Sequence, residues 1–196
     1  TRKIFRTLVN TVKKPISLKM RIGVTEENKS LFLDIAKIAE QEGIQMITLH
    51  GRTVSQGYSG HADWDMIKKL KENSSVPIVG NGDITSPEIA KKVLDYTGCD
   101  YIMIGRGAMG NPFIFEQIND YLEYGEYKPY SLGDRLQAFV DYVELTTKYN
   151  IRFANIKQQA IRFTKGTVGG AQLRNRLSTA KNTVELKELL VQKVTV

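Results

Sequence analysis

Two kinds of hydrophobic pattern alternate along the first 125 residues of the chain. Four short runs, rich in β-branched or apolar residues, are each followed by glycine or polar residues, which favours strands over buried helices. These runs cover residues 16–22, 45–50, 77–80 and 101–105. The stretches between them repeat apolar residues at helical spacing, so the pattern predicts four consecutive β/α units with a parallel sheet.

The helix signals between and after these strands are local. Ser86-Pro87 combines a good N-cap with proline at the first helical position, and Asn111-Pro112 is predicted to open the helix after the fourth strand. A closed (β/α)₈ barrel needs eight such units and typically about 250 residues. Four units therefore predict either a small open sheet or half of a barrel.

After residues 125–129 the pattern becomes helical only. One stretch carries Leu136, Phe139 and Val143 on one face, and a second carries Phe153, Ile156, Ala160 and Phe163. Two further helices are predicted over 171–180 and 184–191. We therefore divide the chain into a β/α part, residues 1–128, and a small helical domain, residues 129–196.

Charge is distributed unevenly between these two parts. The chain has 28 basic and 21 acidic side chains, and the last 46 residues hold nine basic but only two acidic ones. They therefore carry the whole net charge of +7. A local basic surface favours a polyanion partner, nucleic acid first, although a solvated helical face without a partner gives the same pattern.

Composition narrows the class of protein. The single cysteine excludes an internal disulfide framework and a Cys-rich zinc site, and it suits a reducing compartment. No run approaches 18 consecutive apolar residues, and no apolar signal segment follows the basic start, so we expect a cytoplasmic protein without a membrane span. Because His50 and His61 lack companion ligands, no metal site is expected.

Each predicted strand ends in a cation or a glycine-rich turn. Ligand sites of β/α proteins lie beyond the carboxyl ends of the strands, and glycine lets backbone N–H groups approach an anion closely. The residues in question are Lys19 and Arg21, His50 and Arg52, Asn81-Gly82-Asp83, and Gly105-Arg106. The last two turns suit a phosphate, with Arg106 as a charged fork. Taken singly, they also fit tight β/α connections, and Lys19 and His50 fit ordinary strand ends.

These strand ends, in their order along the chain, resemble the tRNA-dihydrouridine synthase family, most closely its DusB or NifR-like branch. The residues that carry the resemblance are Leu18-Lys19-Met20-Arg21, Leu49-His50-Gly51-Arg52-Thr53, Gly57-Tyr58-Ser59-Gly60 with Ala62-Asp63-Trp64, Gly80-Asn81-Gly82-Asp83-Ile84, and Ile104-Gly105-Arg106-Gly107-Ala108 with Gly110-Asn111-Pro112. The resemblance covers nearly the whole chain. The family's fold is an FMN-binding TIM barrel followed by a helical domain.

The resemblance implies an activity and a set of roles. Family members reduce the C5=C6 bond of D-loop uridines in tRNA, with FMN as the hydride carrier and NADPH as the reductant. By resemblance, Lys19 and His50 contact the flavin ring, and Arg21 and Arg52 line the same pocket towards the substrate. The resemblance also implies that the ribityl phosphate is bound by Asn81, Gly82, Asp83, Gly105 and Arg106. It implies that tRNA is bound by Arg162, Lys165, Arg174 and Arg176.

The chain also departs from the family pattern. The family's general acid is a cysteine in an N-terminal motif that this sequence does not contain, and Cys99 is predicted to be a small core residue instead. No catalytic residue is therefore assigned here. We expect the chain alone to be an inactive C-terminal part of the enzyme, with exposed sheet edges that favour dimerisation or aggregation. Alternatives are a non-catalytic tRNA-binding fragment and another FMN barrel of the dihydroorotate dehydrogenase type.

Overall fold

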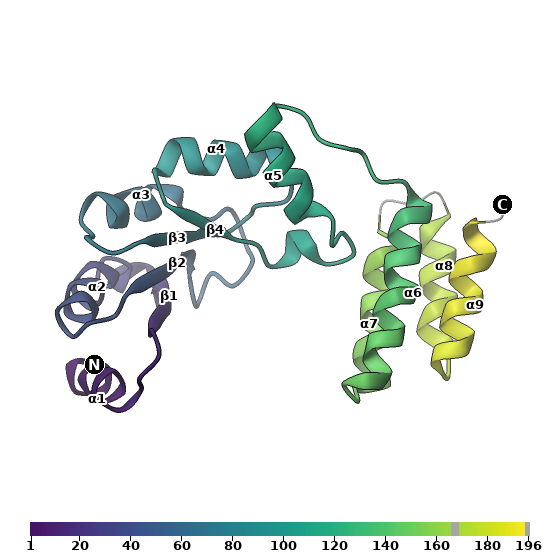
Figure 1. Cartoon of the computed structure of the whole chain (residues 1–196), viewed down its shortest axis with the longest axis horizontal. Helices are drawn as coiled ribbons and strands as arrows, with labels where there is room; N and C mark the ends of the chain where they lie inside the picture. Colours follow the sequence, from purple (N-terminus) through teal and green to yellow (C-terminus); the bar gives the residue numbers. More distant parts are fainter. Residues whose placement is uncertain (166–168, 195–196) are drawn as a thin grey trace. The chain divides into compact units, whose positions relative to one another are not determined.

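The chain folds into two compact units, Thr1–Gly107 and Ala108–Val196, called here the first and second unit. The computed structural model describes residues 1–165 and 169–194. Figure 1 shows strands and helices alternating in the first unit and helices alone in the second.

The first unit contains a four-stranded, all-parallel sheet in the order β1-β2-β3-β4. The strands and α-helices of this unit are α1 (Arg2–Thr11), β1 (Ser17–Gly23), α2 (Phe32–Gln41), β2 (Met46–Thr53), α3 (Trp64–Glu72), β3 (Ile78–Asn81), α4 (Pro87–Thr97) and β4 (Tyr101–Met103). Short 3₁₀ turns lie at Glu26–Asn28 and Arg106–Ala108. The predicted α/β class and parallel sheet are confirmed.

Two strand ends differ from the prediction. β2 continues to Thr53 because its pairing with β1 resumes at Gly23 and Thr53, beyond a shift in register after Arg21 and His50. β4 stops at Met103, and the chain turns into the 3₁₀ segment at Arg106. The glycine turn after β4 is therefore longer than the hydrophobic run suggests.

The two faces of the sheet have different chemistry. Side chains paired in register across parallel strands point to the same face, and successive residues alternate. Ile47 and Leu49 are fully buried, and a Cβ on Gly80, the partner of Leu49, would lie 3.4 Å from Ile67 of α3. This face therefore packs on helices, and the next residues along the strands face the opposite way.

Local capping follows the sequence rules closely in this unit. The Ser86 side chain accepts a hydrogen bond from the N–H of Ile89, and Pro87 occupies the first turn of α4, as predicted. Asp63 caps α3 in the same way, accepting from Met66. Cys99 is 5% exposed, which confirms its predicted place in the core.

The second unit contains helices and, over its described residues, no strand. Its helices are α5 (Ile114–Tyr124), α6 (Leu132–Lys148), α7 (Phe153–Phe163), α8 (Gly170–Thr179) and α9 (Thr183–Val194). Helices α6 to α9 share one apolar core, which includes the fully buried Phe139, Ala160 and Leu177. The helix predicted to open at Asn111-Pro112 begins later, because the backbone from Asn111 to Ile114 first forms a turn.

The division between the units falls earlier than the predicted boundary at residue 128. A Cβ on Gly110 would clash with the carbonyl oxygen of Arg162, so the segment after Gly107 lies directly against the C-terminal end of α7. As a division between a flavin-binding and a tRNA-binding part, 1–128 and 129–196 stays a prediction. Of the helices in the described part of the chain, none is long and apolar enough to cross a membrane.

Candidate functional site

A row of polar side chains crosses the helix-free face of the sheet near the carboxyl ends of its strands. Arg21 is in register with His50, and His50 with Asn81. Lys19 lies one row below Arg21 on the same face and is exposed. The structure thus brings these four predicted site residues together, because parallel pairing places equivalent strand ends side by side.

The surroundings of His50 keep its imidazole neutral. Partial burial is the largest cause, followed by the positive charges of Arg21, Lys19 and Arg52, and together they lower the pKa of His50 from 6.5 to about 4. A neutral imidazole can donate one hydrogen bond and accept another. At pH 7 the positive charge of this row therefore comes from Lys19 and Arg21.

This shifted pKa predicts a pH-dependent stability. Between pH 6.5 and 4 the unfolded chain binds a proton at His50 more readily than the folded chain, so the free energy of unfolding decreases as the pH falls. We expect the stability advantage of the wild type over His50→Gln to shrink by about 1–2 kcal/mol between pH 7.5 and pH 4. Urea denaturation followed by fluorescence of the single tryptophan, Trp64, measures both proteins. A stability difference between the two proteins that does not change with pH would contradict the lowered pKa of His50.

A sharp turn follows β3 beside this row. Gly82 has φ +137° and Asp83 has φ +56°, a region that L side chains rarely adopt. A Cβ on Gly82 would lie 2.6 Å from the Cβ of Ala62 and 3.4 Å from Cδ2 of His50. The Gly82 carbonyl accepts a 3.2 Å hydrogen bond from Nε1 of Trp64, which fixes the turn from outside.

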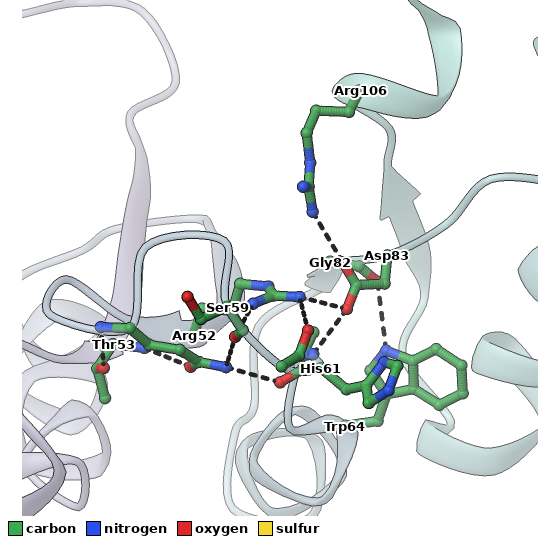
Figure 2. A network of polar contacts seen from close by, with 11 residues as sticks. Arg52, Thr53, Ser59, His61, Trp64, Gly82, Asp83 and Arg106 are labelled. Carbon is green, nitrogen blue, oxygen red and sulfur yellow. Dashed lines mark hydrogen bonds and ion pairs between the residues drawn. The ribbon is translucent and has the colours of Figure 1, made fainter.

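The Asp83 carboxylate joins three separate segments (Figure 2). One oxygen accepts from Nη2 of Arg52 and from the N–H of Ala62, both at 2.7 Å, and the other accepts from Nη2 of Arg106 at 2.9 Å. Partial burial would raise the pKa of Asp83, but these donors outweigh it and hold the pKa below its usual range. The side chain predicted to contact a phosphate thus accepts hydrogen bonds from two arginines and one backbone N–H of the protein itself.

Arg52 differs from its predicted role in contacting the substrate. The residue is 1% exposed, and its guanidinium also donates to the carbonyls of Ser59 and Gly60 at 2.7 and 2.8 Å. Its Nε has no hydrogen-bond partner among the described residues. Because the side chain is buried under the segment 54–62, it holds that segment in place and does not present its charge to a macromolecule.

Arg106 lies at the exposed side of this network. Its guanidinium carbon is 4.3 Å from the centre of the Tyr58 ring, and its side chain is 44% exposed. Sequence reasoning assigned no role to Tyr58, although Gly57-Tyr58-Ser59-Gly60 was among the motifs that carried the resemblance. That motif was the sequence signal that could have pointed to a contact between Tyr58 and Arg106.

The remaining predicted site residues of the first unit differ in their contacts with the rest of the protein. The side-chain amide of Asn81 donates to the Met103 carbonyl at 2.7 Å, which ties β3 to β4. Gly105 is exposed, and a Cβ there would meet no atom within 4 Å. Arg21 donates to the Thr53 carbonyl at 2.7 Å, so its side chain lies across the end of β2.

The four predicted tRNA-binding residues all belong to the second unit. Arg162 and Lys165 are exposed, while Ile156, Ala160 and Phe163 on the other side of α7 are buried, as the pattern predicts. Arg176 is exposed on α8. Arg174 is half-buried and donates to the Thr164 carbonyl at 3.3 Å, so it also stabilises the end of α7.

Neither the cysteine nor the acidic residues suggest a further catalytic or metal site in the described part of the chain. The Sγ of Cys99 lies under Gly80, where an added Cβ would approach it to 2.9 Å, on the face covered by helices. Among residues 1–165 and 169–194 no group of three or more His, Cys, Asp or Glu side chains could hold a metal ion.

Comparison with known proteins agrees with the motifs at the strand ends. The chain is 37% identical to a probable tRNA-dihydrouridine synthase of Rickettsia bellii over 194 residues, which are 97% of this chain and 59% of that protein. It is 52% identical to tRNA-dihydrouridine synthase B of Vibrio parahaemolyticus over 122 residues, covering 62% of this chain and 38% of the relative. For the Yersinia pestis protein of the same name, identity is 46% over 140 residues, with 71% and 43% covered.

The chain therefore spans less than two thirds of the length of these relatives. The model of the dihydrouridine synthase (Dus) family matches residues 1–196, including both units. The predicted resemblance to this family, with a likeness to its B-type synthases, is confirmed. From the strand-end motifs and this match over the full sequence it follows that the chain belongs to the dihydrouridine synthase family.

Proposed function

We propose that the protein is an FMN- and NADPH-dependent tRNA-dihydrouridine synthase that reduces the C5=C6 bond of a D-loop uridine. The observation that carries this proposal is the row of Lys19, Arg21 and His50 at the strand ends, beside the Gly82 turn and Arg106. The family membership and the names of the relatives support the same reaction.

We propose further that the first unit is the C-terminal half of a (β/α)₈ TIM barrel and that a small helical tRNA-binding domain follows it. The strand order supports a barrel, since each strand pairs with the next one in sequence. A doubly wound open sheet instead reverses its strand order at a switch point. The shared core of α6 to α9 supports a separate helical domain.

The residues at the sheet edge fit FMN by the chemistry of their donors. A phosphate dianion requires donors, and Arg106 together with the backbone of the Gly82 and Gly105 turns offers them. The exposed Lys19 and the half-buried Arg21 offer positive charge beside the neutral His50, and such charge would stabilise the negative charge of a reduced flavin ring. When bound, FMN would supply the hydride for the reduction.

Each of these residues has a distinct task in the proposed reaction. Lys19 and His50 orient the ring, and His50 can both donate and accept a hydrogen bond because its imidazole is neutral. Gly82, Gly105 and Arg106 hold the phosphate. Arg21, whose side chain lies across the end of β2, contributes positive charge beside the reacting base. The proton for C5 is assigned to no residue of this chain.

The second unit supplies the proposed contact with tRNA. Arg162, Lys165 and Arg176 are exposed on or beside α7 and α8, and the last 46 residues of this unit hold nine basic but only two acidic side chains. Neutralising phosphates releases counterions, so affinity for tRNA is expected to fall steeply with salt. Arg174 contributes charge to the same region while capping α7.

Titration with FMN, followed by flavin fluorescence, tests the cofactor part of the proposal. We expect micromolar binding that weakens roughly tenfold or more in Arg106→Gln, because a charge-assisted hydrogen bond to phosphate is lost. Arg6→Gln is the matched control. Arg6 lies on α1, is also exposed, and forms an ion pair at 2.8 Å with Glu42, the residue after α2. FMN affinity that is equal in both variants would contradict the phosphate site.

A second titration separates the alternatives. Salt-dependent affinity for tRNA, reduced in a variant with Arg162 and Lys165 replaced by Gln, supports a tRNA enzyme. FMN binding without tRNA affinity would instead favour an FMN barrel with a small substrate. Affinity for tRNA without FMN binding would favour a non-catalytic tRNA-binding module. Family membership is unaffected by either result.

A further inference from the structure

Arg106 is held from two sides by other side chains of the chain. Asp83 accepts a hydrogen bond from its Nη2 at 2.9 Å, and the Tyr58 ring lies 4.3 Å from its guanidinium carbon. Figure 2 shows the arginine side chain extending towards the Asp83 carboxylate. An exposed arginine side chain ordinarily samples many rotamers, whereas these two contacts restrict this one.

The contacts leave part of the guanidinium available. Its Nε and Nη1 make no hydrogen bond to any residue that the structure describes, and the side chain is 44% exposed. The five N–H donors of arginine are arranged in a planar fork that matches two oxygens of a phosphate. Asp83 occupies only one N–H of Nη2, so four of the five N–H donors remain for an anion.

Tyr58 is itself held by its neighbours in the chain. Arg52 donates to the carbonyls of Ser59 and Gly60, directly after Tyr58, and also to Asp83. The side-chain amide of Gln56 donates to the Ser59 carbonyl at 2.9 Å. The backbone that follows Tyr58 and the carboxylate beside Arg106 therefore belong to one hydrogen-bonded frame, from which the Tyr58 ring extends to the Arg106 guanidinium.

We propose that Tyr58 and Asp83 are positioning residues that hold the Arg106 guanidinium in the orientation in which it binds a phosphomonoester, and so set a preference for FMN over riboflavin. This inference rests on the proposed flavin site. Asp83 acts through Arg106, since a carboxylate facing a phosphate dianion would repel it. Fixing the arginine in advance reduces the entropy that binding must remove.

The test compares FMN with riboflavin, which lacks the phosphate, in the full chain. The ratio of the two dissociation constants isolates the contribution of the phosphate. We expect Tyr58→Leu to lower this ratio roughly three- to tenfold, because the cation–π contact and the restraint on Arg106 are lost. Affinity for riboflavin is expected to stay the same. Tyr58→Phe keeps the aromatic face, so its ratio should match the wild type.

Tyr96→Leu is the matched control. Tyr96 is also exposed and lies over a cation, with Lys68 Nζ 5.3 Å from its ring centre, but it is on α4 and away from the strand-end turns. Its ratio should equal that of the wild type. Asp83→Asn should lower the ratio at least as much as Tyr58→Leu, provided that circular dichroism shows a folded protein.

The possible outcomes separate the two proposals. A wild type that prefers FMN while Tyr58→Leu keeps the same ratio would overturn the positioning role and leave the flavin site intact. Equal loss of affinity for both flavins in Tyr58→Leu would also overturn it, because the ring would then act on the whole site. A wild type without preference for FMN, or without flavin binding, would overturn the phosphate site and this inference together.

Discussion

Replacing Arg52 by leucine is expected to destabilise the first unit by about 3 kcal/mol. The substitution removes the donor to three acceptors at once, namely Asp83 and the carbonyls of Ser59 and Gly60. Breaking a buried ion pair by removing one partner leaves the other charge without compensation. Asp83 is 21% exposed, so water can reach part of its carboxylate, and we expect the low end of the usual range.

Urea denaturation followed by Trp64 fluorescence measures this loss, because Trp64 bonds directly to the Gly82 turn beside the network. Lys71→Met serves as the control. Lys71 is ion-paired to Asp100 at 2.8 Å in the same unit, but both side chains are about a third exposed, and such pairs contribute less than about 1 kcal/mol. Equal effects of the two substitutions would mean that the burial of Arg52 has no energetic consequence.

Phe139→Ala is expected to destabilise the second unit by about 4 kcal/mol. Phe139 is fully buried in the core shared by α6 to α9, and its ring lies 5.3 Å from that of Phe163. Truncation removes the buried apolar surface and leaves a cavity that a core formed by four helices fills only in part. This is a large share of the stability of a unit of this size.

The helical signal in circular dichroism, followed through urea denaturation, measures the effect. Phe115→Ala is the control, because Phe115 lies on α5 in the same unit but is 52% exposed, and its loss should be below about 1 kcal/mol. If the second unit binds tRNA as proposed, affinity for tRNA should decrease together with folding in Phe139→Ala. Retained helical stability would show that the core tolerates the cavity.

Much of the fold could be predicted because its signals are local. Strand and helix periodicities depend on residues two to four positions apart, and they placed all four strands and the core residues of α7. Caps such as Ser86-Pro87 depend on neighbours within one turn. Where the prediction was wrong, at the start of α5 and the ends of β2 and β4, pairing and turns beyond the hydrophobic run decided the boundary.

The sequence by itself determined that the cations and glycine turns lie together at one edge of the sheet. They follow the strands, and parallel β/α units bring the carboxyl ends of their strands to the same edge. Only the tertiary structure decided what each side chain does there. Arg52 is buried because the segment 54–62 covers it, and Arg106 meets both Asp83 and Tyr58 from elsewhere in the chain. The pKa of His50 likewise depends on burial and on charges from neighbouring strands. Such contacts join residues far apart in the chain, so the hydrophobic periodicity of the sequence does not predict them.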